Sequence, residues 1–294
     1  MTLPTAWDVK VATGEPRAVI RVRNLNATLG ETAGQDAWGR NGRVQPALIA
    51  AEAVLTAPFT EAAVTDSVAN DTVHYGTLSK ALLKSIGRWE VTASKETAPG
   101  SLGDVLAGLW LDLTGQVAAG GQTTGLASKV LLRADVVRQL AVTVLLPKAS
   151  LVGEGVSLTT TGLLAQDGEA APASKTLRLH RLHVSTLVGV HPHERTAKQA
   201  VVIDVALDRY DDLRDSYAQL ESFVVQIVEA SSFETLEALG THLARKILRE
   251  FRPHGPLPDD GLPSWYIHVA LEKPIAVPFA DAPVVEVRMA AEHL

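Results

Sequence analysis

The sequence predicts an α+β protein built from two similar units, each with the element order ββααββ. Apolar residues alternate in eight short stretches, which is typical of strands with one buried face. They recur at helical spacing in four longer stretches, and the order of the stretches is the same in both halves of the chain. A segment rich in Ala, Gly and Pro at 162–176 separates the halves. We therefore expect a first unit over 16–162, a linker over 163–175 and a second unit over 176–294.

The second unit has the clearer pattern. Strands are expected at 176–189 and 201–207, joined by the polar turn 191–198 into a hairpin. Two helices should follow, because apolar residues recur at i, i+3, i+4 and i+7 along Leu220, Phe223, Val224, Ile227 and Val228, and again along Leu236, Leu239, Leu243, Ile247 and Leu248. Strands at 265–271 and 284–289 complete the unit.

The first unit repeats this order. Strands are expected at 18–29 and 45–55, and closing strands at 136–146 and 156–161. Between them, two helices are marked by the apolar residues Leu78, Leu82, Leu83 and Ile86, and by Leu102, Val105, Leu106, Leu109 and Leu113.

Such units have sheet surface that a single unit leaves uncovered. The helices cover one face of each four-stranded sheet, and the outer strands have edges that need partners. We expect the sheets to continue into neighbouring units and to close a barrel, so that no edge stays free. A ring of identical chains is the usual way to close, so a homodimer or homotetramer is expected.

Composition excludes several classes of function. The chain has 294 residues, of which 46% are hydrophobic, and its formal net charge is −6. It lacks a basic block for nucleic acid or an anionic membrane, an apolar run near the ~18 residues needed to span a bilayer, and a secretion signal pattern. It has no cysteine, which excludes disulfides, thiolate zinc sites and a cysteine nucleophile. We expect a soluble, cytoplasmic protein.

Several sequence blocks resemble the dihydroneopterin aldolase family. The most specific is Val64–Gly76, which ends in Asp71-Thr-Val-His-Tyr75-Gly76. Three weaker blocks occur in the right order, at 189–199, 235–239 and 272–274. The stretch Asp36-Ala-Trp-Gly-Arg40, with Gln45-Pro46, is similar to the first aldolase repeat of fungal folate-synthesis proteins, in which two such domains run in tandem. The resemblance implies the tunnelling fold, in which ββααββ units assemble into a barrel with active sites between neighbouring units.

The same resemblance implies a reaction. The family cleaves 7,8-dihydroneopterin by a retro-aldol step into 6-hydroxymethyl-7,8-dihydropterin and glycolaldehyde, in folate biosynthesis. A base removes the 2′-hydroxyl proton, and the electrons of the broken C–C bond flow into the adjacent C=N of the pterin. The substrate is its own electron sink, so no Schiff base, metal or cofactor is expected. The missing cysteines also count against the zinc-dependent cyclohydrolase on the same fold.

Four residues of the second unit acquire roles from this resemblance. Glu237, beside Leu236, would bind the pterin by accepting from its N3–H and 2-amino group, although an acidic residue in a first helical turn is also favoured by the helix dipole. Lys273 would transfer a proton near the side-chain hydroxyl, with Glu194 beside it. Without the resemblance, Lys273 is an ordinary lysine at a strand end and Glu194 an ordinary loop carboxylate.

The first unit would line the pterin pocket through Thr72, Val73 and Tyr75, with Tyr75 orienting the hydroxyl or proton. The alternatives are that Thr72 caps a turn and Tyr75 is a core aromatic. His74 is expected to be structural. His191 and His193 form an H-x-H pair that would suit a metal, but a third ligand is not evident and no metal site is predicted.

The two units differ from the family pattern in complementary ways. The first has Arg40 where the second has Glu194, and Asp104 where the anchor glutamate is expected, but it keeps Lys148. The second lacks the D-T-V-H segment before Tyr217. We expect one chain to supply one complete site, with Thr72 and Tyr75 from the first unit and the rest from the second. A site made of Arg40, Asp104, Lys148 and Tyr217 would be dead or altered. The alternatives are an epimerase acting on the same side chain and a non-catalytic pterin-binding or assembly subunit.

Overall fold

The structure is a computed structural model that describes residues 14–31, 33–89, 100–117, 130–165, 172–210, 214–254 and 263–294. In these ranges, eight strands form one antiparallel sheet in chain order. The strands are β1 (Val19–Leu29), β2 (Gln45–Leu55), β3 (Val137–Leu146), β4 (Gly155–Leu163), β5 (Ala173–Thr186), β6 (Gln199–Asp208), β7 (Tyr266–Glu272) and β8 (Val284–Met289).

The helices stand between the second and third strands of each half. They are α2 (Glu61–Thr65), α3 (Tyr75–Ile86), α4 (Leu102–Thr114), α5 (Tyr217–Glu229) and α6 (Leu236–Glu250). Of the 3-10 turns, η1 (Gly87–Trp89) follows α3, η2 (Pro192–Arg195) lies between β5 and β6, and η4 (Ala291–His293) follows β8. The predicted α+β class and the antiparallel strands are confirmed. No helix among the described residues is long and apolar enough to cross a membrane.

Two local differences from the sequence predictions have clear causes. β5 begins at Ala173, because its first residues pair with β4, so 173–175 belongs to a strand and not to the expected linker. Residues 166–171 of that linker lie outside the described ranges. The short helix α2 was not predicted. The Asp71 carboxylate holds its first turn by accepting from the backbone N–H groups of Thr60, Glu61 and Ala62.

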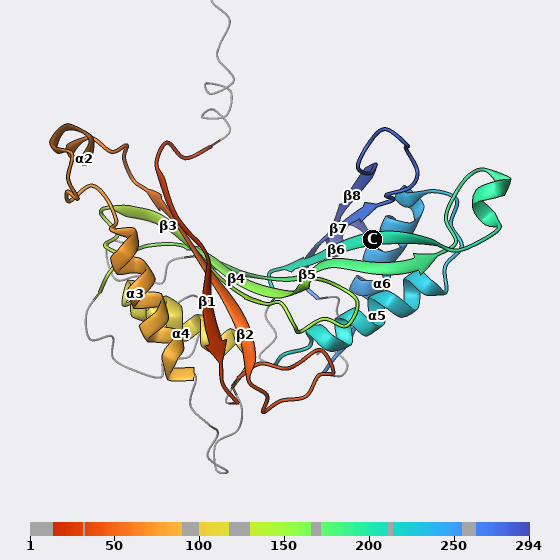
Figure 1. Cartoon of the computed structure of the whole chain (residues 1–294), viewed down its shortest axis with the longest axis horizontal. Helices are drawn as coiled ribbons and strands as arrows, with labels where there is room; N and C mark the ends of the chain where they lie inside the picture. Colours follow the sequence, from red (N-terminus) through yellow and green to blue (C-terminus); the bar gives the residue numbers. More distant parts are fainter. Residues whose placement is uncertain are drawn as a thin grey trace, which may run out of the picture.

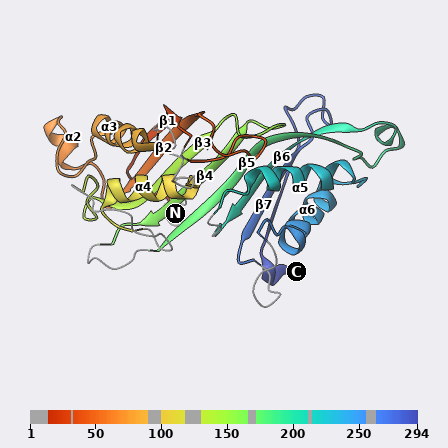
Figure 2. The same ribbon diagram turned by 90° about the horizontal axis from the view of Figure 1, so that it is seen from below.

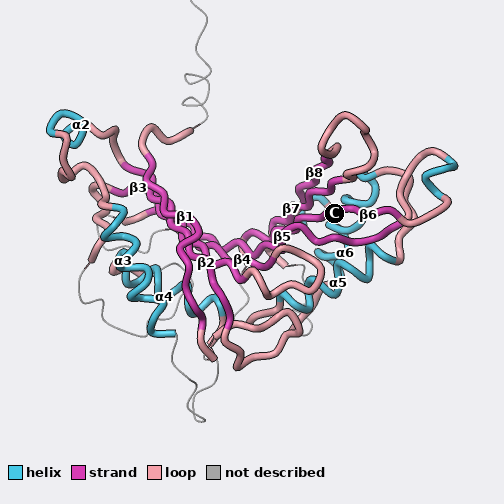
Figure 3. Tube along the Cα trace, in the orientation of Figure 1, coloured by secondary structure: helices cyan, strands magenta, loops and turns pink. Residues whose placement is uncertain are grey.

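The sheet is an open arch with its helices on the outer side (Figure 1). Seen from below, α3 and α4 lie under one half of the sheet and α5 and α6 under the other (Figure 2). The tube drawing shows the same layering, with no helix on the inner face (Figure 3). The sheet does not close within the chain, so β1 and β8 remain as its two edges.

The inner face of the arch is polar. Along β3, Val142 and Val144 face the helices and are fully buried, whereas the intervening Thr143 is part-exposed and its hydroxyl lies 2.8 Å from that of Thr159 on β4. Further along the sheet, Arg178 and Asp204 form an ion pair. What lacks a partner within the described sheet is therefore the pair of strand edges, β1 and β8.

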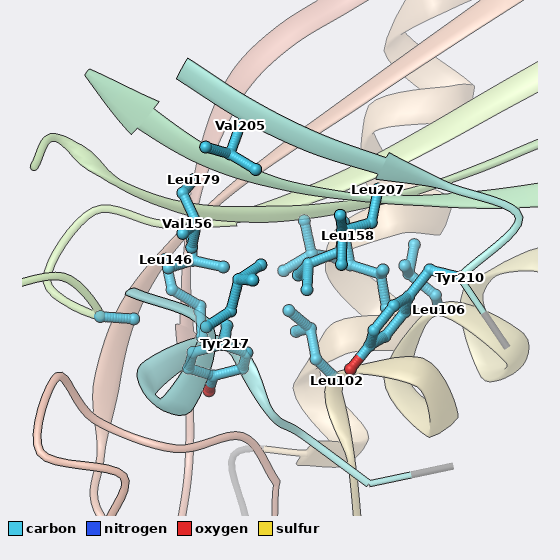
Figure 4. Close-up of a cluster of buried hydrophobic side chains, with 14 of the residues drawn as sticks. Leu102, Leu106, Leu146, Val156, Leu158, Leu179, Val205, Leu207, Tyr210 and Tyr217 are labelled. Atoms are coloured by element: carbon cyan, nitrogen blue, oxygen red, sulfur yellow. The ribbon is translucent and has the colours of Figure 1, made fainter. Parts of the chain in front are cut away.

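The core runs without a break through the junction of the two halves. β4 pairs with β5 from Gly155↔His180 to Gly162↔Ala173. Figure 4 shows side chains from both halves packed together beneath this pair, among them Leu106 of α4, Leu158 of β4 and Leu207 of β6. The two halves thus share one apolar core.

The halves also repeat small irregularities. β1 and β5 each contain a register shift against the next strand, and each shift contains a residue with positive φ, Asn24 (φ 51°) and Arg181 (φ 46°). Gln45 and Gln199 both begin a second strand, and the side chain of each donates to a backbone carbonyl of the preceding loop.

Candidate functional site

The candidate site is centred on a buried lysine, Lys273, at the end of β7. Lys273 directly follows β7 and is 6% exposed. Its Nζ lies 2.5 Å from Oε1 of Glu194 and donates to the carbonyl of Val188 at 3.2 Å. A buried ammonium is tolerated only with a charged partner and further hydrogen bonds, and both are present. The structure therefore brings together the two residues to which the sequence assigned proton transfer.

The turn that contains Glu194 is shaped around its carboxylate. Glu194 lies in η2, and its Oε2 accepts from the N–H of His191 at 3.0 Å. The lysine hydrogen bond and this amide lower the pKa of Glu194 from 4.5 to about 2. Gly189 has φ +150°, and a Cβ on it would stand 2.4 Å from Cβ of Glu194. Only glycine leaves room for the side chain to fold back over the turn.

Two polar side chains fix this turn in place. Gln199 donates through Nε2 to the carbonyls of Val188 and Glu194, at 3.0 and 2.7 Å. Arg195 donates to the carbonyls of Gly189, Ser232 and Phe233, at 3.0–3.2 Å. Sequence reasoning assigned no role to Arg195, because its partners are backbone atoms that no motif records.

The start of α6 is held beside the same turn. The N–H of Gly189 donates to the carbonyl of Phe233 at 3.4 Å, and Thr235 caps the helix by accepting from the N–H of Ala238. Leu236 is buried at the first helical position, and Glu237 is exposed at the second. Glu237 is thus an exposed carboxylate at the start of a helix whose preceding residues are hydrogen-bonded to the turn that contains Glu194.

The first-unit residues lie in the other arm of the arch. Tyr75 is the first residue of α3 and is 69% exposed. α3 packs on β1 and α4, whereas α6 packs on β7 and β8, and Figure 1 shows these groups on opposite arms. Thr72 and Val73, just before α3, are half-buried. One chain therefore does not bring Thr72, Val73 and Tyr75 to Lys273, which corrects the expectation of a complete site within one chain.

His74 has the structural role expected of it. Its Nδ1 accepts from the N–H groups of Gly76 and Thr77, at 3.0 and 3.2 Å, and so caps α3. The residue that caps α3 is thus His74. The alternative role given to Thr72, that of a cap, does not apply to this helix.

Within one chain, the structure instead brings Tyr217 of the second half against the loop that contains Gln35 in the first half. Tyr217, at the start of α5, is fully buried, and its hydroxyl donates to the carbonyl of Gln35 at 2.7 Å and accepts from the Gln35 N–H. Burial raises the pKa of Tyr217 well above its usual value. Gln45 also donates to this carbonyl, at 2.5 Å. The junction between the halves is therefore sealed by a tyrosine whose hydroxyl is committed to the backbone.

The remaining first-unit residues are not arranged as a site. Arg40 pairs with Asp36 at 2.6 Å, and Lys148 is exposed. Asp104 forms a capping box with Ser101 as the third residue of α4, whereas Glu237 is the second residue of α6. The first-half residue at the position of Glu237 is thus Gly103. The expected match of Asp104 to Glu237 is wrong by one residue, because the caps Ser101 and Thr235 set the helix starts.

Two clefts of the described surface are lined by neither Lys273 nor Glu194. One, of about 700 Å³, lies between the loop with Trp38 and the helix residue Phe223, and another, of about 510 Å³, adjoins Phe233. The rings of His191 and His193 stack with centroids 5.5 Å apart. No group of three or more metal-binding side chains occurs in the described ranges.

One buried carboxylate was missed by sequence reasoning. Glu221 of α5 is 5% exposed, and its Oε1 accepts from the N–H groups of Leu151 and Val152, at 2.8 and 3.3 Å. It ties α5 to the turn between β3 and β4. No residue pattern signals this role, because its partners are again backbone groups.

One family model matches the second half of the chain. Residues 177–288 match the family model FolB, dihydroneopterin aldolase. No curated protein matches the sequence. Among solved structures, Escherichia coli dihydroneopterin aldolase in complex with neopterin is 26% identical over 39% of this chain and 98% of its own, with a TM-score of 0.33.

Other solved structures resemble the whole chain. A uricase from Bacillus fastidious is 7% identical, with a TM-score of 0.58 over 95% of this chain and 94% of its own. A mutant urate oxidase from Bacillus sp. TB-90 is 10% identical, with a TM-score of 0.56 over 93% of this chain and 99% of its own. At these identities the likeness shows the fold alone. The chain thus shares the uricase and tunnelling-type architecture, and its second half carries the aldolase family match.

Proposed function

We propose that the protein is a dihydroneopterin aldolase-like lyase that cleaves 7,8-dihydroneopterin into 6-hydroxymethyl-7,8-dihydropterin and glycolaldehyde in folate biosynthesis. The observation that carries the proposal is the buried Lys273–Glu194 pair, which lies within the segment that matches the aldolase family model. A buried lysine with a specific carboxylate partner is the kind of group that moves protons in an active site.

The proposed chemistry needs one mobile proton. The neutral amine form of Lys273, directly or through a water, takes the proton of the 2′-hydroxyl and becomes the ammonium that pairs with Glu194. The C1′–C2′ bond then breaks, C2′ becomes the aldehyde carbon of glycolaldehyde, and the electron pair moves through C1′ and C6 onto N5. Return of a proton to C1′ gives the hydroxymethyl product. Glu194 holds Lys273 in place by its 2.5 Å contact. Electrons and protons balance without an external oxidant.

Substrate binding is assigned to residues from both halves. Glu237 accepts from the N3–H and 2-amino groups of the pterin, and the backbone of Leu236 lies beside it. Thr72, Val73 and Tyr75 line the other side of the ring. In support, Glu237 and Tyr75 are exposed, and no side-chain hydrogen bond to another described residue occupies their functional groups, whereas the corresponding Tyr217 is buried.

The proposal extends to the architecture. The repeated element order, the matching irregularities at Asn24 and Arg181, and the paired glutamines support a tandem duplication of one unit. The free edges of the sheet support a barrel closed by oligomerisation, as a homodimer or homotetramer.

The test compares two lysines. Turnover of 7,8-dihydroneopterin is measured for Lys273→Ala and for the matched control Lys148→Ala, which changes the corresponding exposed lysine of the first half. We expect Lys273→Ala to lower turnover by ~10²–10⁴-fold and Lys148→Ala to have little effect. Equal activity in both variants would contradict the assignment.

Two further measurements separate the alternatives. Chromatography of the products distinguishes cleavage from epimerisation of the same side chain, and binding without either product would indicate a non-catalytic pterin-binding subunit. We expect activity to persist in EDTA. Loss in EDTA with recovery on adding zinc would contradict the metal-independent mechanism and favour a site at His191 and His193.

A further inference from the structure

The parts of the proposed site that lie in the second half come from three segments that are far apart in the chain. Lys273 directly follows β7, Glu194 lies in the turn between β5 and β6, and Glu237 is the second residue of α6. The 2.5 Å contact between Lys273 and Glu194 joins the first two segments. The reaction needs the third at a fixed distance as well, because the group that binds the pterin ring must present the side-chain hydroxyl to the lysine.

Arg195 links the third segment to the other two. Its Nη1 donates to the carbonyls of Gly189 and Phe233, both at 3.2 Å, and its Nη2 donates to the carbonyl of Ser232 at 3.0 Å. Gly189 belongs to the turn that contains Glu194, whereas Ser232 and Phe233 lie just before α6. One half-buried guanidinium therefore holds this turn against the segment that leads into α6.

The loop that Arg195 contacts is also the loop that the lysine contacts. The carbonyl of Val188 accepts from Nζ of Lys273 at 3.2 Å, and the next carbonyl, that of Gly189, accepts from Arg195. A backbone contact between the same two segments is longer, with the N–H of Gly189 3.4 Å from the carbonyl of Phe233. Hydrogen bonds from a charged donor are stronger than those between neutral groups, so we expect Arg195 to determine the spacing of these segments.

The first half of the chain has a different residue at this place. The glutamines that begin β2 and β6 align the two halves, so that Asn41 corresponds to Arg195 and Arg40 to Glu194. The second residue of α4 is a glycine, whereas the second residue of α6 is a glutamate. The arginine thus occurs in the half that has both acidic residues of the proposed site, and a short uncharged side chain stands in its place in the half that has neither.

We propose that Arg195 is a positioning residue for the proposed reaction. It fixes the start of α6 relative to the Lys273–Glu194 pair, so that a pterin bound at Glu237 has its 2′-hydroxyl within reach of Lys273. The inference rests on the proposed function for its substrate. Arg195 acts through the two loops and contacts neither the ring nor the hydroxyl, so its removal should lower the rate of proton transfer more than the affinity for the ring.

Three variants test this role. Arg195→Met removes the donors and keeps an extended side chain, whereas Arg195→Lys keeps the charge and loses the planar fork that reaches both segments. Lys198→Met is the matched control, because Lys198 follows the same turn and its Nζ donates to a different carbonyl, that of Glu229 at the end of α5, at 2.7 Å. For each variant, kcat and KM are measured with 7,8-dihydroneopterin, and affinity is measured for a pterin without the cleavable side chain.

We expect Arg195→Met to lower kcat by ~10–10²-fold, since a misplacement of ~1 Å can cost about 10²-fold in rate. Affinity for the pterin ring should be nearly unchanged, Arg195→Lys should be intermediate, and Lys198→Met should match the wild type. Equal kcat in Arg195→Met and Lys198→Met would overturn the inference, and so would a loss of ring affinity as large as the loss of kcat. Should Arg195→Met not fold, a wild-type kcat in folded Arg195→Lys would overturn it equally.

Amide hydrogen exchange separates this inference from the proposed function. The N–H groups of Gly189 and Ala238 lie in the two linked parts of the structure, and their exchange is measured without substrate. Both should exchange faster in Arg195→Met than in Lys198→Met. This difference in a protein whose wild type does not cleave 7,8-dihydroneopterin would refute the proposed function and leave the link standing. Cleavage by the wild type, with equal exchange and equal kcat in the two variants, would refute the role of Arg195 alone.

Discussion

The Nζ of Lys273 lies 2.5 Å from a carboxylate oxygen of Glu194, a residue 79 positions earlier in the chain. The contact joins the end of β7 to the turn between β5 and β6. Because Lys273 is 6% exposed, removing its partner Glu194 would leave a polar group buried with only the Val188 carbonyl to contact. The pair therefore links the stability of this end of the sheet to the site.

Glu194→Gln should make that link visible as a pH effect. The folded pKa of about 2 lies below the ordinary 4.5, so the ionised carboxylate stabilises the fold above about pH 4.5, and the contribution is lost as the pH falls toward 2. The difference in unfolding free energy between wild type and variant should be full at pH 6 and smaller at pH 3. Urea unfolding at both values measures it, with Glu234→Gln as an exposed control. A difference that does not change with pH would contradict the assignment.

Gly189→Ala should displace Glu194. The new Cβ would stand 2.4 Å from Cβ of Glu194, at a φ of +150°. We expect a loss of about 1–3 kcal/mol of stability, which is typical of overpacking, together with a fall in turnover. The control is Gly87→Ala, where nothing lies within 4 Å of the added Cβ. Normal turnover in Gly189→Ala would mean that the position of Glu194 does not matter for the reaction.

Glu237→Ala should weaken pterin binding with little effect on stability. The pterin would lose a charged acceptor, and a hydrogen bond to a charged group is worth about 1.5–3 kcal/mol. Calorimetric titration with a non-reactive pterin measures the change, and the exposed neighbour Glu234→Ala is the control. Unchanged affinity would leave Glu237 only its favourable interaction with the helix dipole.

The two tyrosines should separate stability from activity. Tyr217→Phe leaves the backbone of Gln35 without its hydroxyl partner, so we expect about 1–3 kcal/mol of destabilisation and nearly normal turnover in the folded fraction. Tyr75→Phe changes an exposed residue, so we expect normal stability and reduced turnover. Thermal unfolding and initial rates of both variants test this. The opposite pattern would place the working site at the internal junction.

Much of the fold was predictable because apolar alternation and helical spacing are local. β8 was predicted at its observed bounds, and β2 likewise. The partnership of Glu194 with Lys273 followed from the family resemblance, whereas the burial of Lys273 did not, since it depends on a turn far away in the chain.

The failures have equally physical causes. Asp104 was matched to Glu237 because both are acidic and lie near the start of a helix. The capping residues Ser101 and Thr235 fix where each helix begins, so Asp104 is the third residue of α4 and Glu237 is the second residue of α6. Whether Tyr75 or Tyr217 is buried at the junction inside the chain depends on the order of the two halves in the sheet. That order is a property of the β4–β5 junction, and residue patterns within each half do not encode it.

The central claim is that Lys273 of one chain and Tyr75 of another form one working site. Co-expression of Tyr75→Phe chains with Lys273→Ala chains tests it most directly. Each variant alone is predicted to be impaired, and Lys273→Ala severely. In a ring of two chains with random mixing, half of the rings are mixed and each has one intact junction, so about a quarter of the wild-type 7,8-dihydroneopterin cleavage should return. No recovery, from a mixture that demonstrably forms mixed oligomers, would contradict the account.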